Sequence, residues 1–154
     1  MTPKRTSATG SGGKRGRGIE IRAARKEDTA AIGGLIRLFP QQLVQRNLPR
    51  VPSFFVAYAG GELVGCCALQ VYSKRLAEVR SLAVHPDFQD RGIASRLVEC
   101  CTRRASERGI RELFAVTSQT SFFGRLGFAT FRREKTAMFL ELRPGSGVSQ
   151  GDRR

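Results

Sequence analysis

Residues 78–98 constrain the fold of this chain more than any other stretch. Apolar and polar residues alternate up to Pro86, a polar loop follows, and an amphipathic pattern begins after Gly92. This order predicts a strand, a glycine-bearing turn and a helix. The first turn of a helix has backbone N–H groups without partners and lies at the positive end of the helix dipole. Because Gly92 keeps the approach clear, this turn is a candidate phosphate site.

The rest of the sequence predicts strands and helices in alternation with short turns. Strands are expected over 19–24, 53–58, 62–71, 76–84 and 111–116, a strand pair over 128–142, and helices over 26–39, 92–108 and 121–126. The first helix should bury Ala31, Ile32, Leu35, Ile36 and Phe39 and end at Pro40. Gly60-Gly61 predicts a hairpin. Since the strands first follow one another directly and later pass through helices, we expect a mixed sheet with helices on both faces, an α/β fold.

The composition favours one globular domain with two tails. The chain has 154 residues, and 40% of them are hydrophobic. Residues 1–18 contain five basic residues, no acidic residue and many small polar ones, and 144–154 consist mainly of Gly, Ser and other polar residues. Neither segment can bury enough apolar surface to offset the entropy of ordering it. We therefore expect disordered tails at 1–18 and 144–154 around a domain at 19–143.

The net charge of +14 is divided between these parts. The tails contribute +5 and +1, which leaves +8 on residues 19–143. A basic surface attracts nucleic acid, an acidic membrane or an anionic ligand. A phosphate-bearing ligand at the predicted turn accounts for part of this charge, so nucleic acid is not the expected main partner.

Two further features bear on the compartment. Cys66-Cys67 and Cys100-Cys101 are adjacent pairs and not C-x-x-C motifs, which favours buried thiols in a reducing compartment over a metal or redox site. No apolar run approaches the roughly 18 residues of a membrane span, and the N-terminal segment lacks the apolar core of a secretory signal. The expected location is the cytoplasm, with no membrane contact and no metal.

Gln89-Asp-Arg-Gly-Ile-Ala94 resembles the Q/R-x-x-G-x-G/A pyrophosphate loop of the GNAT superfamily of acetyl-CoA-dependent N-acetyltransferases. Leu82-Ala-Val-His-Pro-Asp87 before it, the amphipathic helix after it and Phe123-Gly-Arg-Leu-Gly-Phe128 extend the resemblance over residues 19–142. The resemblance implies a GNAT-type mixed, mostly antiparallel central sheet with helices on both faces. It also implies acetyl-CoA as co-substrate and an amine as acceptor. Homodimers are common in the family, so a second copy of the chain is an open partner.

The same resemblance implies where acetyl-CoA binds. The pantetheine arm lies along the backbone of Leu82, Ala83 and Val84, as a neighbouring strand would. The pyrophosphate lies on the loop and the start of the helix, at Gln89, Asp90, Arg91, Gly92, Ile93 and Ala94.

N-acetylation requires a group that removes a proton, because an ammonium has no lone pair. Glu78, six residues before Val84 on the same strand, is the candidate base, since many GNAT enzymes have a glutamate near this position. The alternative is an exposed strand carboxylate paired with a nearby cation. His85 titrates near neutrality and is a second candidate, although its position before Pro86 also suits a residue that shapes the loop.

The leaving thiolate has no obvious acid. The superfamily commonly has a tyrosine four residues before the Gly-Phe pair, and this chain has Phe123 there. Val116 likewise stands where an asparagine is usual. Either water protonates the thiolate, or a hydroxyl of Ser118, Thr120 or Ser121 hydrogen-bonds it, and Ser118 is the favoured candidate.

Four segments resemble one particular group within the superfamily. They are Leu48-Pro-Arg50, Gly65-Cys-Cys-Ala-Leu69, Ala77-Glu-Val-Arg-Ser-Leu82 and Thr117-Ser-Gln-Thr-Ser-Phe-Phe123. They resemble the acetyltransferase domain of bacterial amino-acid N-acetyltransferases, whose type member is the N-acetylglutamate synthase of arginine biosynthesis. This implies a small amino acid, with glutamate favoured, as acceptor. By that likeness Arg50 is a candidate clamp for the acceptor carboxylate, with Lys74 and Arg80 as further candidates, because arginine pairs with carboxylates through two parallel hydrogen bonds.

Three alternatives remain open at this point. Arg50 also fits a solvated loop arginine. The acceptor also fits another amine, such as a polyamine, an antibiotic, a protein N-terminus or a lysine. A non-catalytic module that binds acyl-CoA or tethers nucleic acid is the third alternative, and the basic tail and Phe123 motivate it.

Overall fold

The computed structural model describes residues 18–130, which fall into two units. The first unit extends to Gln119 and the second begins at Thr120, and each is described by itself. The first unit contains β1 (Ile19–Ala23), η1 (Lys26–Asp28), α1 (Thr29–Ile36), η2 (Val51–Ser53), β2 (Phe54–Ala59), β3 (Glu62–Val71), β4 (Leu76–Val84), η3 (Pro86–Phe88), α2 (Ile93–Glu107) and β5 (Glu112–Phe114), where η marks a turn of 3-10 helix. The second contains α3 (Thr120–Arg125).

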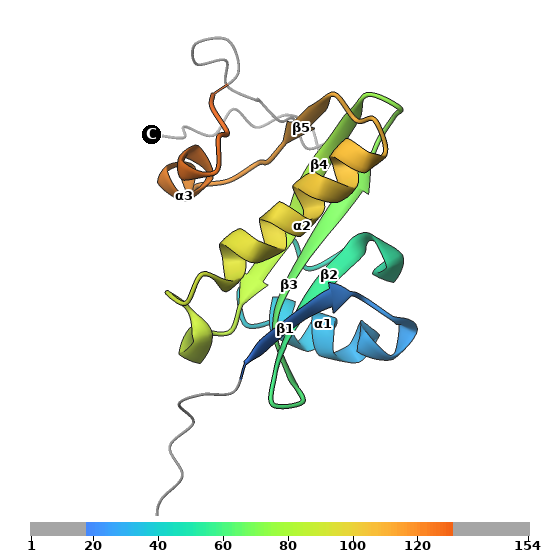
Figure 1. The fold of residues 1–154 in the computed structure, drawn as a ribbon. Coiled ribbons are helices and arrows are strands. Elements are labelled where there is room, and N and C mark those ends of the chain that lie inside the picture. Colours follow the sequence, from blue (N-terminus) through green and yellow to red (C-terminus); the bar gives the residue numbers. More distant parts are fainter. Residues whose placement is uncertain (1–17, 131–154) are drawn as a thin grey trace, which may run out of the picture. The chain divides into compact units, whose positions relative to one another are not determined.

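Five strands form one sheet in the order β1-β2-β3-β4-β5 (Figure 1). The first three pairings are antiparallel, and β4 pairs with β5 in parallel. The parallel pairing arises because α2 carries the chain back between β4 and β5. This confirms the predicted mixed, mostly antiparallel sheet.

Helices cover both faces of the sheet, as predicted. The adjacent residues Cys66 and Cys67 of β3 are fully buried on opposite faces. Cys66 belongs to the core under α1, whereas the Cys67 sulfur lies 3.6 Å from the sulfur of Cys101 in α2. Figure 1 shows α2 lying along β3 and β4, and α1 packs against the same two strands. The four cysteines are free thiols, and Cys100 is the half-buried one.

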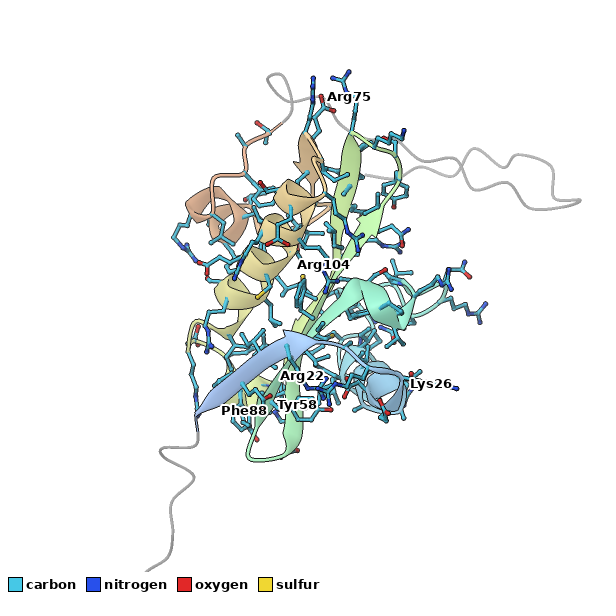
Figure 2. All side chains as sticks on the ribbon, turned by 45° about the vertical axis from the view of Figure 1, so that its right-hand side comes forward. Arg22, Lys26, Tyr58, Arg75, Phe88 and Arg104 are labelled. Carbon is cyan, nitrogen blue, oxygen red and sulfur yellow. The ribbon has the colours of Figure 1, made fainter. Side chains whose placement is uncertain are left out.

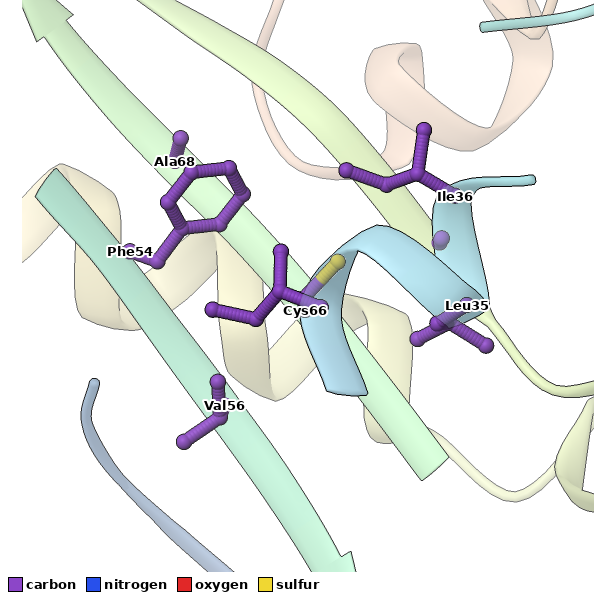
Figure 3. Packing of buried hydrophobic residues seen from close by; sticks show 8 residues of the cluster. Leu35, Ile36, Phe54, Val56, Cys66 and Ala68 are labelled. Atoms are coloured by element: carbon purple, nitrogen blue, oxygen red, sulfur yellow. The ribbon is translucent and has the colours of Figure 1, made fainter. Parts of the chain in front are cut away.

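The core beneath α1 is built from small and medium-sized apolar residues. Figure 3 shows Cys66 of β3 between the side chains of Leu35 and Ile36 of α1 and those of Phe54 and Val56 of β2, all in one buried cluster. On the other face, α2 buries five residues at helical spacing, in agreement with the sequence pattern: Ile93, Leu97, Val98, Cys101 and Ala105. Gly109, at a φ of 71°, ends this helix, because the N–H of Ile110 then reaches the carbonyl of Ala105.

The first helix is shorter than predicted. It begins as 3-10 turn η1 and ends at Ile36, four residues before Pro40. The side-chain amide of Gln45 donates to the carbonyls of Ile36, Phe39 and Leu43, which satisfies groups that a longer helix would have used. Ala31, predicted to be buried, is exposed.

Two other expectations differ from the structure. The fifth strand covers Glu112–Phe114 and not 111–116. Of the strand pair predicted over 128–142, residues 128–130 are not in a strand and the remainder lies outside the described residues.

An ionic cluster around the buried Asp28 joins β1, η1 and β2. Arg22 binds Asp28 through two hydrogen bonds, of 2.8 and 3.0 Å. The hydroxyl of Tyr58 and the backbone N–H of Arg25 also donate to Asp28, each at 2.6 Å. Figure 2 shows Arg22 and Tyr58 close together, and the Arg22 guanidinium lies 4.9 Å from the centre of the Tyr58 ring. The Arg22 hydrogen bond holds the pKa of Asp28 well below its usual range.

Candidate functional site

Strand β4 contains a bulge that the sequence analysis did not predict. Cys66 pairs with Ala83 and Ala68 with Arg80, so that two steps along β3 match three steps along β4. The extra residue falls at Ser81 or Leu82, and Ser81 has a φ of 52°. The thiol of Cys66 donates to the carbonyl of Ser81 at 3.4 Å, which holds this irregular segment from the α1 face.

The strand is open on its β5 side beyond the pairing region. Only Leu76, Ala77 and Glu78 of β4 pair with β5. Among residues 18–130, no strand pairs with the β5 side of Val79–Val84. This stretch includes Leu82, Ala83 and Val84, the residues predicted to hold the pantetheine arm. Peptide groups at such an edge bind an extended ligand as a further strand would bind.

The loop after β4 ends at an unblocked helix N-terminus. Gly92 is the N-cap of α2, has a φ of 74° and offers no side chain to the first turn. A Cβ at Gly92 would meet nothing within 4 Å, so the space beside this residue is open. The first N–H groups of α2, those of Ile93 and Ala94 among them, lack intrahelical partners. The site therefore suits the anionic phosphates of coenzyme A.

Polar side chains of the loop bind the loop itself. The amide of Gln89 donates to the carbonyl of Val84 at 3.1 Å. Arg91 donates to the carbonyl of Asp87 at 3.1 Å and lies over the Phe88 ring, which Figure 2 labels. Asp90 is exposed, with a φ of 59°. These contacts fix the loop conformation, and roles of Gln89, Asp90 and Arg91 toward a phosphate stay predictions.

His85 shapes the same loop. Its Nδ1 accepts a hydrogen bond from the backbone N–H of Asp87, and its backbone N–H donates to the carbonyl of Val64. The imidazole also meets the Phe88 ring edge-on. These contacts support the alternative that His85 shapes the loop.

Glu78 lies in a polar and aromatic cluster. The hydroxyl of Tyr72 donates to Oε2 of Glu78, and the Arg80 Nε lies 3.9 Å from the same oxygen. The Glu78 side chain is 13% exposed. Tyr72 stacks on Phe114 of β5, with ring centres 6.0 Å apart. The hydrogen bond to Glu78 raises the pKa of Tyr72, since a phenolate could not donate it, and burial and the like charge of the carboxylate act in the same direction.

The pairing register places this cluster on the α1 face of the sheet. Arg80 pairs with Ala68, which belongs to the core under α1, and Glu78 pairs with Gln70 two residues further along. Residues that pair directly across antiparallel strands share a face. Glu78 and Arg80 therefore extend the α1 face of β4 beyond the apolar core.

The predicted clamp residues lie in two exposed segments and on β4. Arg50 immediately precedes η2, which lies against β3, and it forms no ion pair within residues 18–130. Arg104 of α2, labelled in Figure 2, donates to the carbonyl of Pro52 and so links η2 to α2. Lys74 is exposed in the turn between β3 and β4. Of the three candidates, only Arg80 directly neighbours Glu78.

Ser118 and Phe123 belong to different units. Ser118 is exposed in the segment after β5, beside a turn in which the Thr117 hydroxyl accepts from the N–H of Gln119. In the second unit, Phe123 is buried and meets the Phe122 and Phe128 rings edge-on. Its ring thus has a packing role in the second unit.

Two kinds of site are absent from the part of the chain that the structure describes. Residues 18–130 contain no cluster of three or more His, Cys, Asp or Glu side chains that would hold a metal ion. Within the same residues, no helix combines the length and the apolar character that crossing a membrane requires.

Comparison with known proteins identifies the family. Residues 51–130 match the model of the acetyltransferase (GNAT) domain. An uncharacterised N-acetyltransferase of Chlorobaculum tepidum is 35% identical over 120 residues, which cover 74% of this chain and 77% of the relative. The chain belongs to the GNAT family. As a GNAT protein it is an acetyl-CoA-dependent N-acetyltransferase.

Other GNAT relatives are named amino-acid acetyltransferases. One from Mycobacterium tuberculosis is 34% identical over 116 residues, which cover 70% of this chain and 67% of the relative. One from Pasteurella multocida is 33% identical over 116 residues, but these cover only 26% of that protein. This GNAT chain thus spans about a quarter of the length of some amino-acid acetyltransferases.

Solved GNAT structures agree with the fold. Rv2747 from Mycobacterium tuberculosis, in complex with CoA and NLQ, superimposes with a TM-score of 0.70 at 31% identity, covering 77% of this chain and 76% of that one. N-acetylglutamate synthase from Neisseria gonorrhoeae, complexed with coenzyme A and N-acetyl-glutamate, gives 0.63 at 28% identity, covering 73% of this chain and 28% of that one.

Sequence reasoning missed Tyr72 and Phe114 as neighbours of Glu78. A signal for Tyr72 existed, because a hairpin turn between 71 and 76 places Tyr72 diagonally across from Glu78. Phe114 gave no such signal, since the register of a parallel strand that follows a helix cannot be counted from a turn length.

Proposed function

We propose that this GNAT protein transfers the acetyl group of acetyl-CoA to the amine of a small amino acid, with glutamate as the favoured acceptor, in arginine biosynthesis. The observation that carries the proposal is Glu78, a carboxylate on the same strand as the open β4 edge, with Arg80 beside it. The amino-acid acetyltransferases among its relatives support the acceptor class.

Acetyl-CoA binds along the open edge of β4 in this proposal. Its pantetheine arm pairs with the backbone of Leu82, Ala83 and Val84, and its pyrophosphate lies on the first turn of α2 after Gly92. The unpaired edge and the open space beside Gly92 support this placement. The thioester carbonyl then lies near the bulge, on the strand that carries Glu78.

The reaction is attack of a neutral amine on the thioester carbon. Glu78 removes a proton from the acceptor ammonium, directly or through water, and the amine nitrogen then forms the new N–C bond. The amine nitrogen, which becomes positively charged on attack, loses a second proton to water. The C–S bond breaks, the thiolate of coenzyme A leaves, and a neutral amide remains. Ser118 hydrogen-bonds this thiolate, which then takes up a proton from water. A thiolate is a moderate base, so it leaves without a strong acid, and the phenylalanine at position 123 does not prevent turnover.

The acceptor carboxylate is bound by cations around Glu78. Arg80 lies beside Glu78, Lys74 lies in the turn before β4, and Arg50 precedes η2, which lies against β3. Basic surroundings of this kind favour an anionic acceptor over a polyamine. Arg50 is the favoured clamp, because it is exposed and forms no ion pair within the described part of the chain. Its guanidinium is therefore available for a two-point contact with a carboxylate.

The test is acetyl-CoA-dependent thiol release with glutamate, other amino acids and spermidine as acceptors. A hydrogen bond to a charged group contributes about 1.5–3 kcal/mol. The Arg50→Ala variant should therefore raise the KM for glutamate about ten- to a hundredfold, with the KM for acetyl-CoA unchanged. Arg46→Ala is the matched control, since Arg46 is an exposed arginine of the same loop.

The outcomes separate the alternatives. Turnover of spermidine that does not depend on Arg50 would contradict the amino-acid acceptor. Binding of acetyl-CoA without turnover of any amine would contradict catalysis through Glu78.

A further inference from the structure

Glu78 presents its two carboxylate oxygens to different surroundings. Oε2 accepts a hydrogen bond from the Tyr72 hydroxyl and is also the oxygen closest to the Arg80 Nε, at 3.9 Å. Oε1 has no hydrogen bond or ion pair with any residue between 18 and 130. One oxygen is therefore fixed by the protein, and the other is available to a substrate.

Tyr72 reaches Glu78 from the end of the sheet away from the bulge. It follows the last residue of β3, and its backbone N–H donates to the carbonyl of Leu76, two residues before Glu78. The bulge lies on the other side of Glu78, at Ser81 and Leu82. A substrate at the bulge and the Tyr72 hydroxyl therefore approach the carboxylate from opposite directions.

Tyr72 is itself held in place, although half of it is exposed to solvent. Its ring stacks on Phe114 with an interplanar angle of 23°, and 53% of the residue is exposed. An exposed tyrosine can change its χ1 rotamer, and an aromatic partner and a carboxylate partner together restrict it to one. The pair thus forms a rigid support for the Glu78 side chain.

We propose that Tyr72 is a positioning residue for acetyl transfer, which holds Oε2 of Glu78 and so directs Oε1 toward the acceptor amine. This rests on the proposed function, in which Glu78 is the base. No proton leaves Tyr72 in the reaction. Its contribution is to fix the carboxylate rotamer.

Tyr72→Phe tests this contact. The variant keeps the ring and loses only the hydroxyl that fixes the Glu78 carboxylate. At the pH optimum kcat should fall about three- to tenfold, while the KM for acetyl-CoA stays the same.

Few other charged groups face Glu78. Its direct partners on β3 and β5 are the uncharged residues Gln70 and Phe114, and α1, which packs on this face, carries no charged residue between Thr29 and Ile36. The charged groups of neighbouring segments are Arg80 on β4, Lys74 and Arg75 in the turn, and Glu112 on β5. All of them remain in Tyr72→Phe, so a fall in kcat reports the lost hydroxyl.

Tyr58→Phe is a closely matched control. The chain has two tyrosines, and each donates its hydroxyl to a carboxylate, Tyr58 to Asp28 and Tyr72 to Glu78. Both substitutions remove one such hydroxyl and retain the ring. Tyr58→Phe should lower the stability and leave the kcat of the folded protein unchanged, whereas Tyr72→Phe should lower kcat with little loss of stability.

Glu78→Gln separates the failure of this inference from that of the proposed function. If Glu78→Gln is inactive and Tyr72→Phe keeps the wild-type kcat, Tyr72 has no positioning role and Glu78 remains the base. If Glu78→Gln turns over as the wild type does, both ideas are overturned. A lower kcat in Tyr72→Phe, with no such fall in Tyr58→Phe, supports the inference.

A second measurement does not depend on activity. With ring-labelled tyrosine, carbon NMR follows the ionisation of both phenols in the full chain, and Tyr58→Phe assigns the two signals. The carboxylate of Glu78 raises the pKa of Tyr72, so Glu78→Gln should lower it. A Tyr72 signal that is unaffected by Glu78→Gln would overturn the contact on which the inference depends.

Discussion

Gly65 of β3 lies against α2 without room for a Cβ, and its replacement by alanine tests how the helix is held. A Cβ at Gly65 would lie 3.0 Å from Leu97, 3.1 Å from Ile93 and 3.2 Å from Ala57. Leu97 and Ile93 are 0% and 1% exposed, so neither has free space into which to move. Ala57 is fully buried in β2 and has no rotamer to change.

The expected cost follows from this crowding. Overpacking of a dense core by one carbon costs about 1–3 kcal/mol, because the neighbours leave their preferred rotamers or the backbone moves. Ile93 is the first residue of α2, immediately after the Gly92 turn. Any shift of the helix therefore changes the proposed phosphate site as well, and Gly65→Ala should bind acetyl-CoA more weakly than the wild type.

Gly34→Ala is the control, because it should change the stability in the opposite direction. Gly34 lies inside α1, and a Cβ at this position would meet only the flexible end of Arg37, at 3.9 Å. Alanine favours a helix over glycine by about 1 kcal/mol, so this variant should be more stable than the wild type. Urea unfolding of both variants, together with calorimetric titration of acetyl-CoA, measures the two effects. Unfolding of Gly65→Ala within about 0.5 kcal/mol of the wild type would refute the argument.

Two further variants test the loop and the ionic cluster. Gly92→Ala should lose about 1–2 kcal/mol and bind acetyl-CoA more weakly, because its φ of 74° disfavours a Cβ, and unchanged affinity in a calorimetric titration would contradict the phosphate site. Asp28→Asn should lose about 1–3 kcal/mol near neutral pH in urea unfolding, since it weakens the hydrogen bonds from Arg22 and Tyr58. The folded state lowers the pKa of Asp28, so the wild-type advantage should be complete above about pH 5 and decrease as the pH falls below 4, and a difference that is independent of pH would exclude this origin.

The elements that could be predicted are those whose own apolar periodicity determines their bounds. Strand β4 was predicted with its observed bounds, and the five buried residues of α2 follow directly from a 3.6-residue period. Strand β5 was predicted too long, because the alternation of apolar and polar residues continues beyond the strand. Only three residues pair with β4, and none of them is buried. The end of α1 depends on Gln45, nine residues beyond Ile36, and no local propensity contains that contact.

The candidate site was predictable to the extent that it lies on one segment. The Gly92 turn and the strand before it are contiguous in sequence, and the strand and the helix lie at the predicted positions. The Tyr72 contact with Glu78 and the bulge depend on the pairing of two strands. Since a bulge leaves no fixed residue signature, its position cannot be read from the alternation of β4 alone.

The bulge changes which residues of β4 face α1. Before it, the even-numbered Glu78 and Arg80 share a face with the core under α1, and after it the odd-numbered Ala83 does. An uninterrupted strand would place Glu78 and Ala83 on opposite faces. Deletion of Ser81 alone would give β4 a single alternation in which Glu78, Arg80 and Ala83 still share a face, and it would remove only the bulge. The extra residue therefore compensates for the odd spacing between the polar half and the apolar half of the strand, which would otherwise face opposite sides of the sheet.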